Sequence, residues 1–118
     1  MNKKISLQTI DIKYKIVIDE IKRVIDAILD QPYELILYGS VARGEAKKDS
    51  DIDLLLLINE PVNFELKRLL LRSVYEIELK REVLISLLIK SKEIWETKYA
   101  PLTLLYSNIQ KEGIDVRH

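Results

Sequence analysis

The sequence contains no cysteine and a single histidine, and these two absences exclude several kinds of chemistry. Without cysteine there is neither a disulfide framework nor a thiolate metal site, which suits a reducing compartment, and we expect a cytoplasmic protein. The only histidine, His118, is the last residue, where a side chain is usually too mobile to serve as a base or a metal ligand. Ser-His catalysis and histidine metal sites are therefore not expected.

Glycine and proline are also scarce, at three residues each, and neither sign of charge predominates. A Gly-x-x-x-x-Gly-Lys phosphate loop and a Gly-rich dinucleotide fingerprint are both missing. Nineteen basic residues balance nineteen acidic ones, so the net charge gives no direct sign of nucleic-acid or membrane binding. The longest apolar run is about five residues, so that neither a signal peptide nor a membrane span is expected.

The length of 118 residues suits one hydrophobic core, and we predict a single domain over residues 1–118. Apolar residues at steps of three and four predict long helices, and short apolar runs predict strands. The predicted helices are 10–29, 62–80 and 102–111, with short helical turns after Ser40 and around Trp95. The predicted strands are 33–38, 51–58 and 82–89.

The order of these elements predicts an α/β or α+β domain, in which helices flank a small mixed sheet of three to four strands. The core would come from the strands and from the apolar faces of the long helices. The stretch from Leu54 to Ile58 is continuously apolar, which is typical of a strand covered on both faces.

The segment GSVARGEAKKDSDID, residues 39–53, joins the first two strands and carries residues suited to a metal. On a strand, Asp51 and Asp53 leave the same face with Cα atoms about 6 to 7 Å apart. Magnesium prefers oxygen ligands and usually takes one or two protein carboxylates besides water and substrate phosphates. Two such ions about 3.5 to 4 Å apart are a standard arrangement for attack on a phosphate. The pair therefore predicts a magnesium site.

The other half of the segment has residues suited to a phosphate. Gly39 lets the backbone approach closely, and Ser40 supplies a hydroxyl where a helix N-cap is expected. Arg43 follows on the first helical turn, and Lys47 and Lys48 add positive charge in the loop. Taken singly, a Gly-Ser turn and three cations are ordinary surface features. Their combination with the aspartates at one end of one sheet favours a site.

The stretch GSVARGEAKKDSDIDLLL resembles the signature of the minimal, antitoxin-like nucleotidyltransferases of the DNA polymerase β-like superfamily. The resemblance is strong over Tyr33 to Ile58, and the rest of the chain, including IKSKEIWE to YSNIQKEGI, is similar in element order and size. It implies the polymerase β palm-like fold, with the triphosphate at Gly39 and Ser40 and two Mg²⁺ ions at the aspartate pair. It also implies transfer of a nucleoside monophosphate, from ATP or another nucleoside triphosphate, to an acceptor hydroxyl with loss of pyrophosphate.

Active members of this superfamily usually carry a third carboxylate on the next strand. Here Ser86 is expected in register with the aspartate pair, and a hydroxyl cannot replace a charged ligand or a base. Glu82 is the alternative third position, on the same predicted strand face but roughly 13 Å from the pair along the chain.

Two hypotheses stay open at this stage. In the first, the protein is a magnesium-dependent enzyme that transfers AMP to a protein, because small members resemble the antitoxin whose partner is an all-helical HEPN-type toxin modified on a tyrosine. In the second, catalysis is weak or lost and the protein is a partner-binding module. In both, a partner or self-association is expected to complete the site. One candidate surface for this contact, with core packing as the alternative, comprises Trp95, Tyr99, Leu105 and Tyr106.

Overall fold

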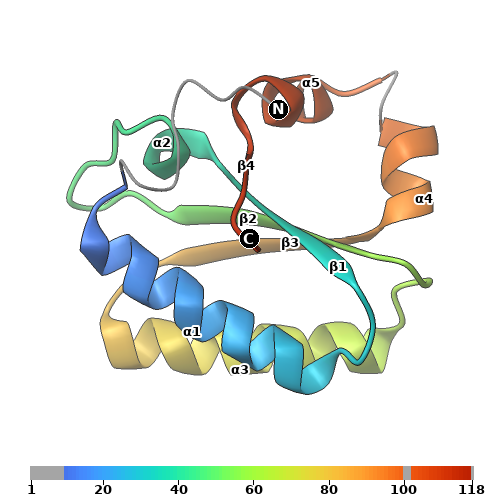
Figure 1. The fold of residues 1–118 in the computed structure, drawn as a ribbon, viewed down its shortest axis with the longest axis horizontal. Helices are drawn as coiled ribbons and strands as arrows, with labels where there is room; N and C mark the ends of the chain where they lie inside the picture. Colours follow the sequence, from blue (N-terminus) through green and yellow to red (C-terminus); the bar gives the residue numbers. More distant parts are fainter. Residues whose placement is uncertain (1–9, 100–101, 118) are drawn as a thin grey trace.

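The computed structural model describes residues 10–99 and 102–117 (Figure 1). Two predictions fall on residues outside these ranges: the absence of a targeting segment at residues 1–9 and the exclusion of His118 from a site. The helices are α1 (Ile12–Ile28), α2 (Gly39–Ala42), α3 (Phe64–Arg81), α4 (Lys92–Ile94), the π-helical turn η2 (Trp95–Tyr99) and α5 (Leu104–Glu112). The strands are β1 (Tyr33–Tyr38), β2 (Ile52–Ile58), β3 (Ile85–Ser91) and β4 (Ile114–Asp115). In this part of the chain, no helix has the length and apolar character needed to cross a bilayer.

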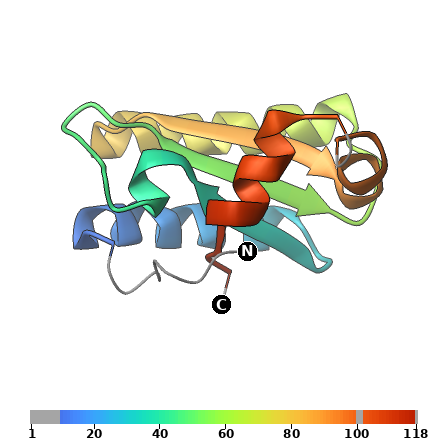
Figure 2. The same ribbon diagram turned by 90° about the horizontal axis from the view of Figure 1, so that it is seen from above.

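The strands form one four-stranded sheet in the order β3-β2-β1-β4. β1 runs antiparallel to both β2 and β4, whereas β2 runs parallel to β3, so the sheet is mixed as predicted. α1 and α3 lie side by side under one face, and α5 crosses the other face (Figures 1 and 2). The predicted α/β class is confirmed, and the sheet forms the middle of three layers.

β2 is an inner strand of the sheet and is buried on both faces. Leu54 and Leu56 are fully buried toward α1 and α3, while Leu55 and Leu57 are buried toward η2 and α5. Full burial of such a side chain is worth about 1.5 to 3 kcal/mol, so β2 is anchored on both faces. This confirms the prediction from its continuous apolar run, and it holds the residues at the start of β2 in place.

Trp95 belongs to the core, which confirms the core-packing alternative for this residue and removes it from the candidate partner surface. Its side chain is 1% exposed and packs with Ile109, and its ring centroid lies 5.3 Å from that of Tyr106. Leu105 and Tyr106 are partly buried against the same cluster, and the side chain of Tyr99 lies outside the described residues. Trp95 is buried because the sheet face that α1 and α3 leave free needs an apolar cover, to which Trp95 and Tyr106 contribute.

The third strand begins three residues later than predicted, and Glu82 does not belong to it. α3 extends to Arg81, and Glu82 ends the helix in the left-handed conformation, with φ 55° and ψ 47°. Its N–H donates to the carbonyl of Glu78, as helix C-termini commonly require. The prediction that Glu82 shares a strand face with the aspartate pair is therefore wrong.

β4 is the strand that the sequence patterns do not reveal, because it is two residues long. Gly113 makes the turn from α5 into β4, where an added Cβ would lie 2.5 Å from the carbonyl of Ile109 and 2.7 Å from Cγ2 of Ile36. Beyond the strand, the N–H of Val116 donates to the carbonyl of Leu35 at 2.9 Å. These contacts bring the end of α5 beside the end of β1.

Candidate active site

The two aspartates lie where β2 begins, next to the end of β1 and the start of β3. Asp51 directly precedes β2 and is exposed, whereas Asp53 is the second residue of the strand and is half-buried. Asp53 pairs with Tyr38 of β1 on one side and with Ser86 of β3 on the other. The predicted register of Ser86 with the aspartate pair is thus present in the sheet.

Gly39 is in direct contact with Asp53. Its φ is +79°, a conformation that favours glycine, and an added Cβ would overlap the Asp53 carboxylate, lying 3.2 Å from Cγ. A side chain at this position would push the carboxylate away. The Gly-Ser turn and the aspartate pair, separate in the sequence, therefore form one site.

Ser40 lies inside α2 and is not its N-cap, contrary to the prediction. The helix begins at Gly39, and Tyr38 takes the N-cap position without a side-chain hydrogen bond. Gly44 ends the turn as predicted, with φ +74°. Within the described residues the hydroxyl of Ser40 has no hydrogen-bond partner.

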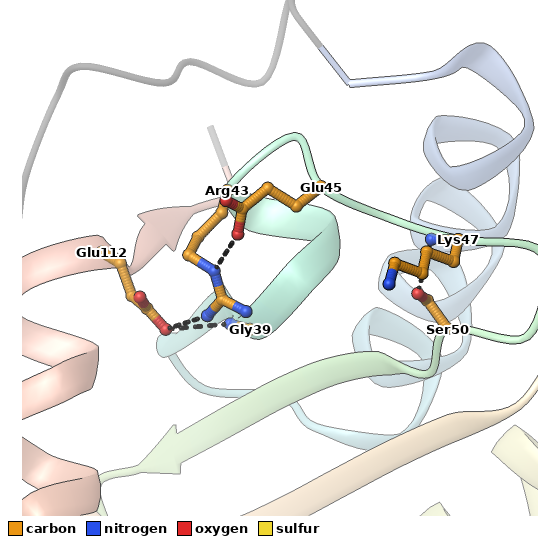
Figure 3. Close-up of polar contacts among 6 residues, drawn as sticks. All are labelled: Gly39, Arg43, Glu45, Lys47, Ser50 and Glu112. Atoms are coloured by element: carbon orange, nitrogen blue, oxygen red, sulfur yellow. Dashed lines mark hydrogen bonds and ion pairs between the residues drawn. The ribbon is translucent and has the colours of Figure 1, made fainter.

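Arg43 is already paired with two carboxylates (Figure 3). Its Nε donates to Oε1 of Glu45 at 2.6 Å, and its Nη1 donates to Oε1 of Glu112 at 3.1 Å. The backbone N–H of Gly39 donates to the same Glu112 oxygen at 3.3 Å. Glu45 and Glu112 hold the pKa of Arg43 above its usual value. Lys47, by contrast, is exposed and contributes its backbone N–H to Ser50 Oγ at 2.7 Å.

Glu112 is the residue of this site that the sequence analysis missed. It lies 73 residues from Gly39, at the last position of α5. No local motif marks it, because only the pairing of β4 with β1 brings it to the Gly-Ser turn. A glutamate directly before a glycine is otherwise an ordinary helix end.

Charge accumulates around Asp53. Burial raises the pKa of its carboxyl, and the nearby charge of Asp51 raises it further, against the opposing effect of Arg43. Burial also raises the pKa of the Tyr38 phenol, and the charge of Asp53 adds to this, so Tyr38 stays neutral at physiological pH. The mutual repulsion of the two carboxylates would be relieved by a cation.

The aspartate pair fits magnesium in donor type and number. Hard carboxylate oxygens from one or two residues are what Mg²⁺ usually takes from a protein, with phosphate and water completing the shell. No group of three or more Asp, Glu, His or Cys residues suited to a metal occurs in the described ranges. Within these ranges neither Glu82 nor Glu112 forms such a group with the pair, and the neighbours of Asp53 on the flanking strands are Tyr38 and Ser86, neither of which is a carboxylate.

The raised pKa of Asp53 predicts how stability depends on pH. Because the folded carboxyl binds its proton more tightly than the unfolded one, whose pKa is 3.8, its charge costs stability above the folded pKa and costs nothing below 3.8. Asp53→Asn should therefore raise the free energy of unfolding slightly at pH 7 without divalent cations, since solvent screens a half-buried charge. Urea unfolding at several pH values measures this difference, which should shrink as the pH falls.

Asp49→Asn is the matched control, since Asp49 is exposed in the loop before β2. It should change the free energy of unfolding by less than Asp53→Asn at pH 7. A wild-type protein more stable than Asp53→Asn at pH 7 without divalent cations would contradict the argument.

Comparison with known proteins is consistent with this geometry. The family described as "Nucleotidyltransferase domain" matches residues 18–116. The curated protein "Putative protein adenylyltransferase MJ0141" of Methanocaldococcus jannaschii is 37% identical over 101 residues, which are 85% of this chain and 95% of that protein. A solved structure described as "Crystal structure of the toxin-antitoxin with AMP-PNP" shares the fold, with a TM-score of 0.57 at 16% identity over 80% of this chain and 68% of that one. The resemblance noted in the sequence is confirmed, and the chain belongs to the nucleotidyltransferase domain family.

Proposed function

We propose that this protein is a magnesium-dependent nucleotidyltransferase that transfers AMP from ATP to a hydroxyl of a partner protein in the cytoplasm. The observation that carries the proposal is the direct contact between Gly39 of the Gly-Ser turn and Asp53 at the start of β2. It supports the proposal because the residues proposed as phosphate donors and those proposed as metal ligands then lie together at one end of the sheet. The name of the archaeal relative, an adenylyltransferase acting on protein, supports AMP as the group transferred.

In the proposed reaction the acceptor oxygen forms a bond to the α-phosphorus of ATP, and the bond from that phosphorus to the bridging oxygen breaks. Pyrophosphate leaves and the hydroxyl proton passes to water. Gly39 and Ser40 hold the departing phosphates, and Asp51 and Asp53 hold the divalent cation. Bound there, Mg²⁺ would neutralise phosphate charge. The residues of the chain thus act by positioning and electrostatics, without a nucleophilic side chain.

The proposed acceptor is a tyrosine of an all-helical HEPN-type toxin, for which this chain would act as antitoxin. The fold shared with a toxin–antitoxin structure supports a partner of this kind. The toxin, or a second copy of this chain, would complete the acceptor side of the site.

The test mixes the purified protein with the product of a neighbouring helical reading frame, Mg²⁺ and ATP labelled at the α-phosphate. We expect label on a partner tyrosine, located by mass spectrometry, and no label when EDTA removes the metal. ATP labelled at the γ-phosphate should leave the partner unlabelled, which distinguishes adenylylation from phosphorylation. Label from the γ-position, or none under any metal, would exclude the proposal.

A second function is favoured by one observation, the hydroxyl of Ser86 opposite Asp53 where a carboxylate would serve as third ligand or base. On this alternative the fold is retained, transfer is weak or absent, and the protein inactivates its partner by binding it. Partner binding that is equally tight without ATP and without Mg²⁺ would support the alternative.

A further inference from the structure

The fold itself places Glu112 against the phosphate-binding residues (Figure 3). β1 and β4 pair through Leu37 and Ile114, in antiparallel register. When this register is continued two residues beyond Leu37 and two before Ile114, Glu112 comes to lie opposite Gly39. The strand pairing therefore brings the backbone of Glu112 beside Gly39, within reach of its side chain.

The backbone next to Glu112 is held in place at Gly113. Gly113 is buried, and its N–H donates to the carbonyl of Ile109 at 2.8 Å. The side chain has more freedom, since 26% of it is exposed. Release of the Gly39 N–H therefore requires rotation of one side chain and no change in the fold.

We propose that Glu112 is an internal competitor of the nucleotide, whose carboxylate occupies the N–H of Gly39 and the guanidinium of Arg43 until the triphosphate displaces it. The inference rests on the proposed function, because it takes these donors as the triphosphate site. Gly39 has a single N–H, which cannot serve a carboxylate and a phosphate together. A carboxylate and a phosphate at the same donors also repel each other.

This competition has a use in the reaction. Transfer leaves pyrophosphate in the site, and its negative charges hold it to the same donors. When pyrophosphate leaves, the Glu112 carboxylate returns to Gly39 and Arg43 and replaces the interactions that these two donors lose. Glu112 thus weakens binding of ATP and of pyrophosphate alike, and it keeps the donors satisfied between turnovers.

Calorimetric titration with α,β-methylene ATP, whose α–β linkage is not cleaved in the transfer, tests the proposal in the presence of Mg²⁺. Glu112→Gln keeps the acceptor oxygen and removes the charge, and it should lower Kd about ten-fold, or 1.4 kcal/mol. Pyrophosphate should also bind more tightly to Glu112→Gln than to the wild type. Glu45→Gln is the matched control, because it removes the other carboxylate from Arg43 and leaves the Gly39 contact intact. The side chain of Glu45 is 65% exposed and its charge is screened by solvent, so the Kd of Glu45→Gln for the analogue should stay within about two-fold of the wild-type Kd.

The three glycines provide a second measurement on the unaltered protein. With ¹⁵N-glycine labelling, saturation with the analogue should shift the resonances of Gly39, which changes its hydrogen-bond partner, and of Gly113, which follows Glu112. Gly44 has no neighbour within 4 Å of its Cβ position and should shift least. A Gly113 resonance that stays in place while that of Gly39 moves would overturn the proposal.

The outcomes separate this inference from the proposed function. Equal or weaker binding by Glu112→Gln, with measurable binding by the wild type, overturns the competition alone. Binding by Glu112→Gln but not by the wild type supports it, whereas no binding by either removes both the competition and the proposed function. Tighter binding by the variant, without transfer to any acceptor, leaves the competition standing and removes the enzyme.

Discussion

Replacement of Asp53 by asparagine is expected to lower the rate of nucleotidyl transfer at least a thousand-fold. The amide is close in shape to the carboxylate but carries no charge, so the proposed divalent cation would lose the more buried of its two proposed ligands. A preorganised electrostatic contact of this kind is worth about 10²- to 10³-fold in rate when one donor is removed, and loss of a metal ligand should exceed that. Initial rates of labelled AMP incorporation into the partner, with Mg²⁺ in excess, measure the effect.

Stability cannot account for such a loss. Asp53→Asn is expected to be slightly more stable than the wild type at neutral pH without metal, because it removes a charge that is half-buried beside Asp51. Asp51→Asn should cost less in rate, about a hundred-fold, since Asp51 is exposed and water can take the vacated coordination position. Asp49→Asn should transfer AMP at the wild-type rate. Activity of Asp53→Asn within ten-fold of wild type would remove Asp53 from the proposed catalytic role.

Sequence patterns predict most of the elements because they are local. The period of the apolar residues in α1 and the unbroken run in β2 each determine which faces are buried, independently of the rest of the chain. The short separation between the Gly-Ser turn and Asp53 follows from the pairing of β1 with β2, which are neighbours in the sequence. The spacing between the Gly-Ser turn and the aspartate pair in the sequence is therefore enough to predict that they lie together.

The rest depends on contacts between distant residues, which carry no local signal. Glu112 reaches Gly39 through β4, and a strand of two residues has no periodicity to detect. The helix end at Glu82 carries no signal in the sequence, because a helix C-terminus in the left-handed conformation usually has glycine, and here it has glutamate. The sequence around Trp95 looks the same whether its side chain packs on the sheet or faces a partner. Only the three-dimensional structure, in which one sheet face needs a cover, shows that Trp95 packs in the core.

Introduction of a carboxylate opposite Asp53 is the complementary change, and it should increase activity. Ser86→Asp places the new side chain on β3 in register with Asp53, where the hydroxyl of Ser86 is exposed. A positioned base contributes 10²- to 10⁴-fold to a proton transfer, and we expect a gain in kcat of about 100-fold. Single-turnover labelling of the partner measures the chemical step without the contribution of product release.

Ser86→Asn is the matched control, because it has nearly the same shape as the aspartate variant and cannot take a proton. It should leave kcat within about three-fold of wild type, so that a gain limited to Ser86→Asp is due to charge. The gain should also depend on Mg²⁺, since a third carboxylate beside Asp51 and Asp53 raises the repulsion that the cation relieves. An unchanged or lower rate for Ser86→Asp, with normal nucleotide binding, would mean that the base comes from the partner or from a group of the nucleotide.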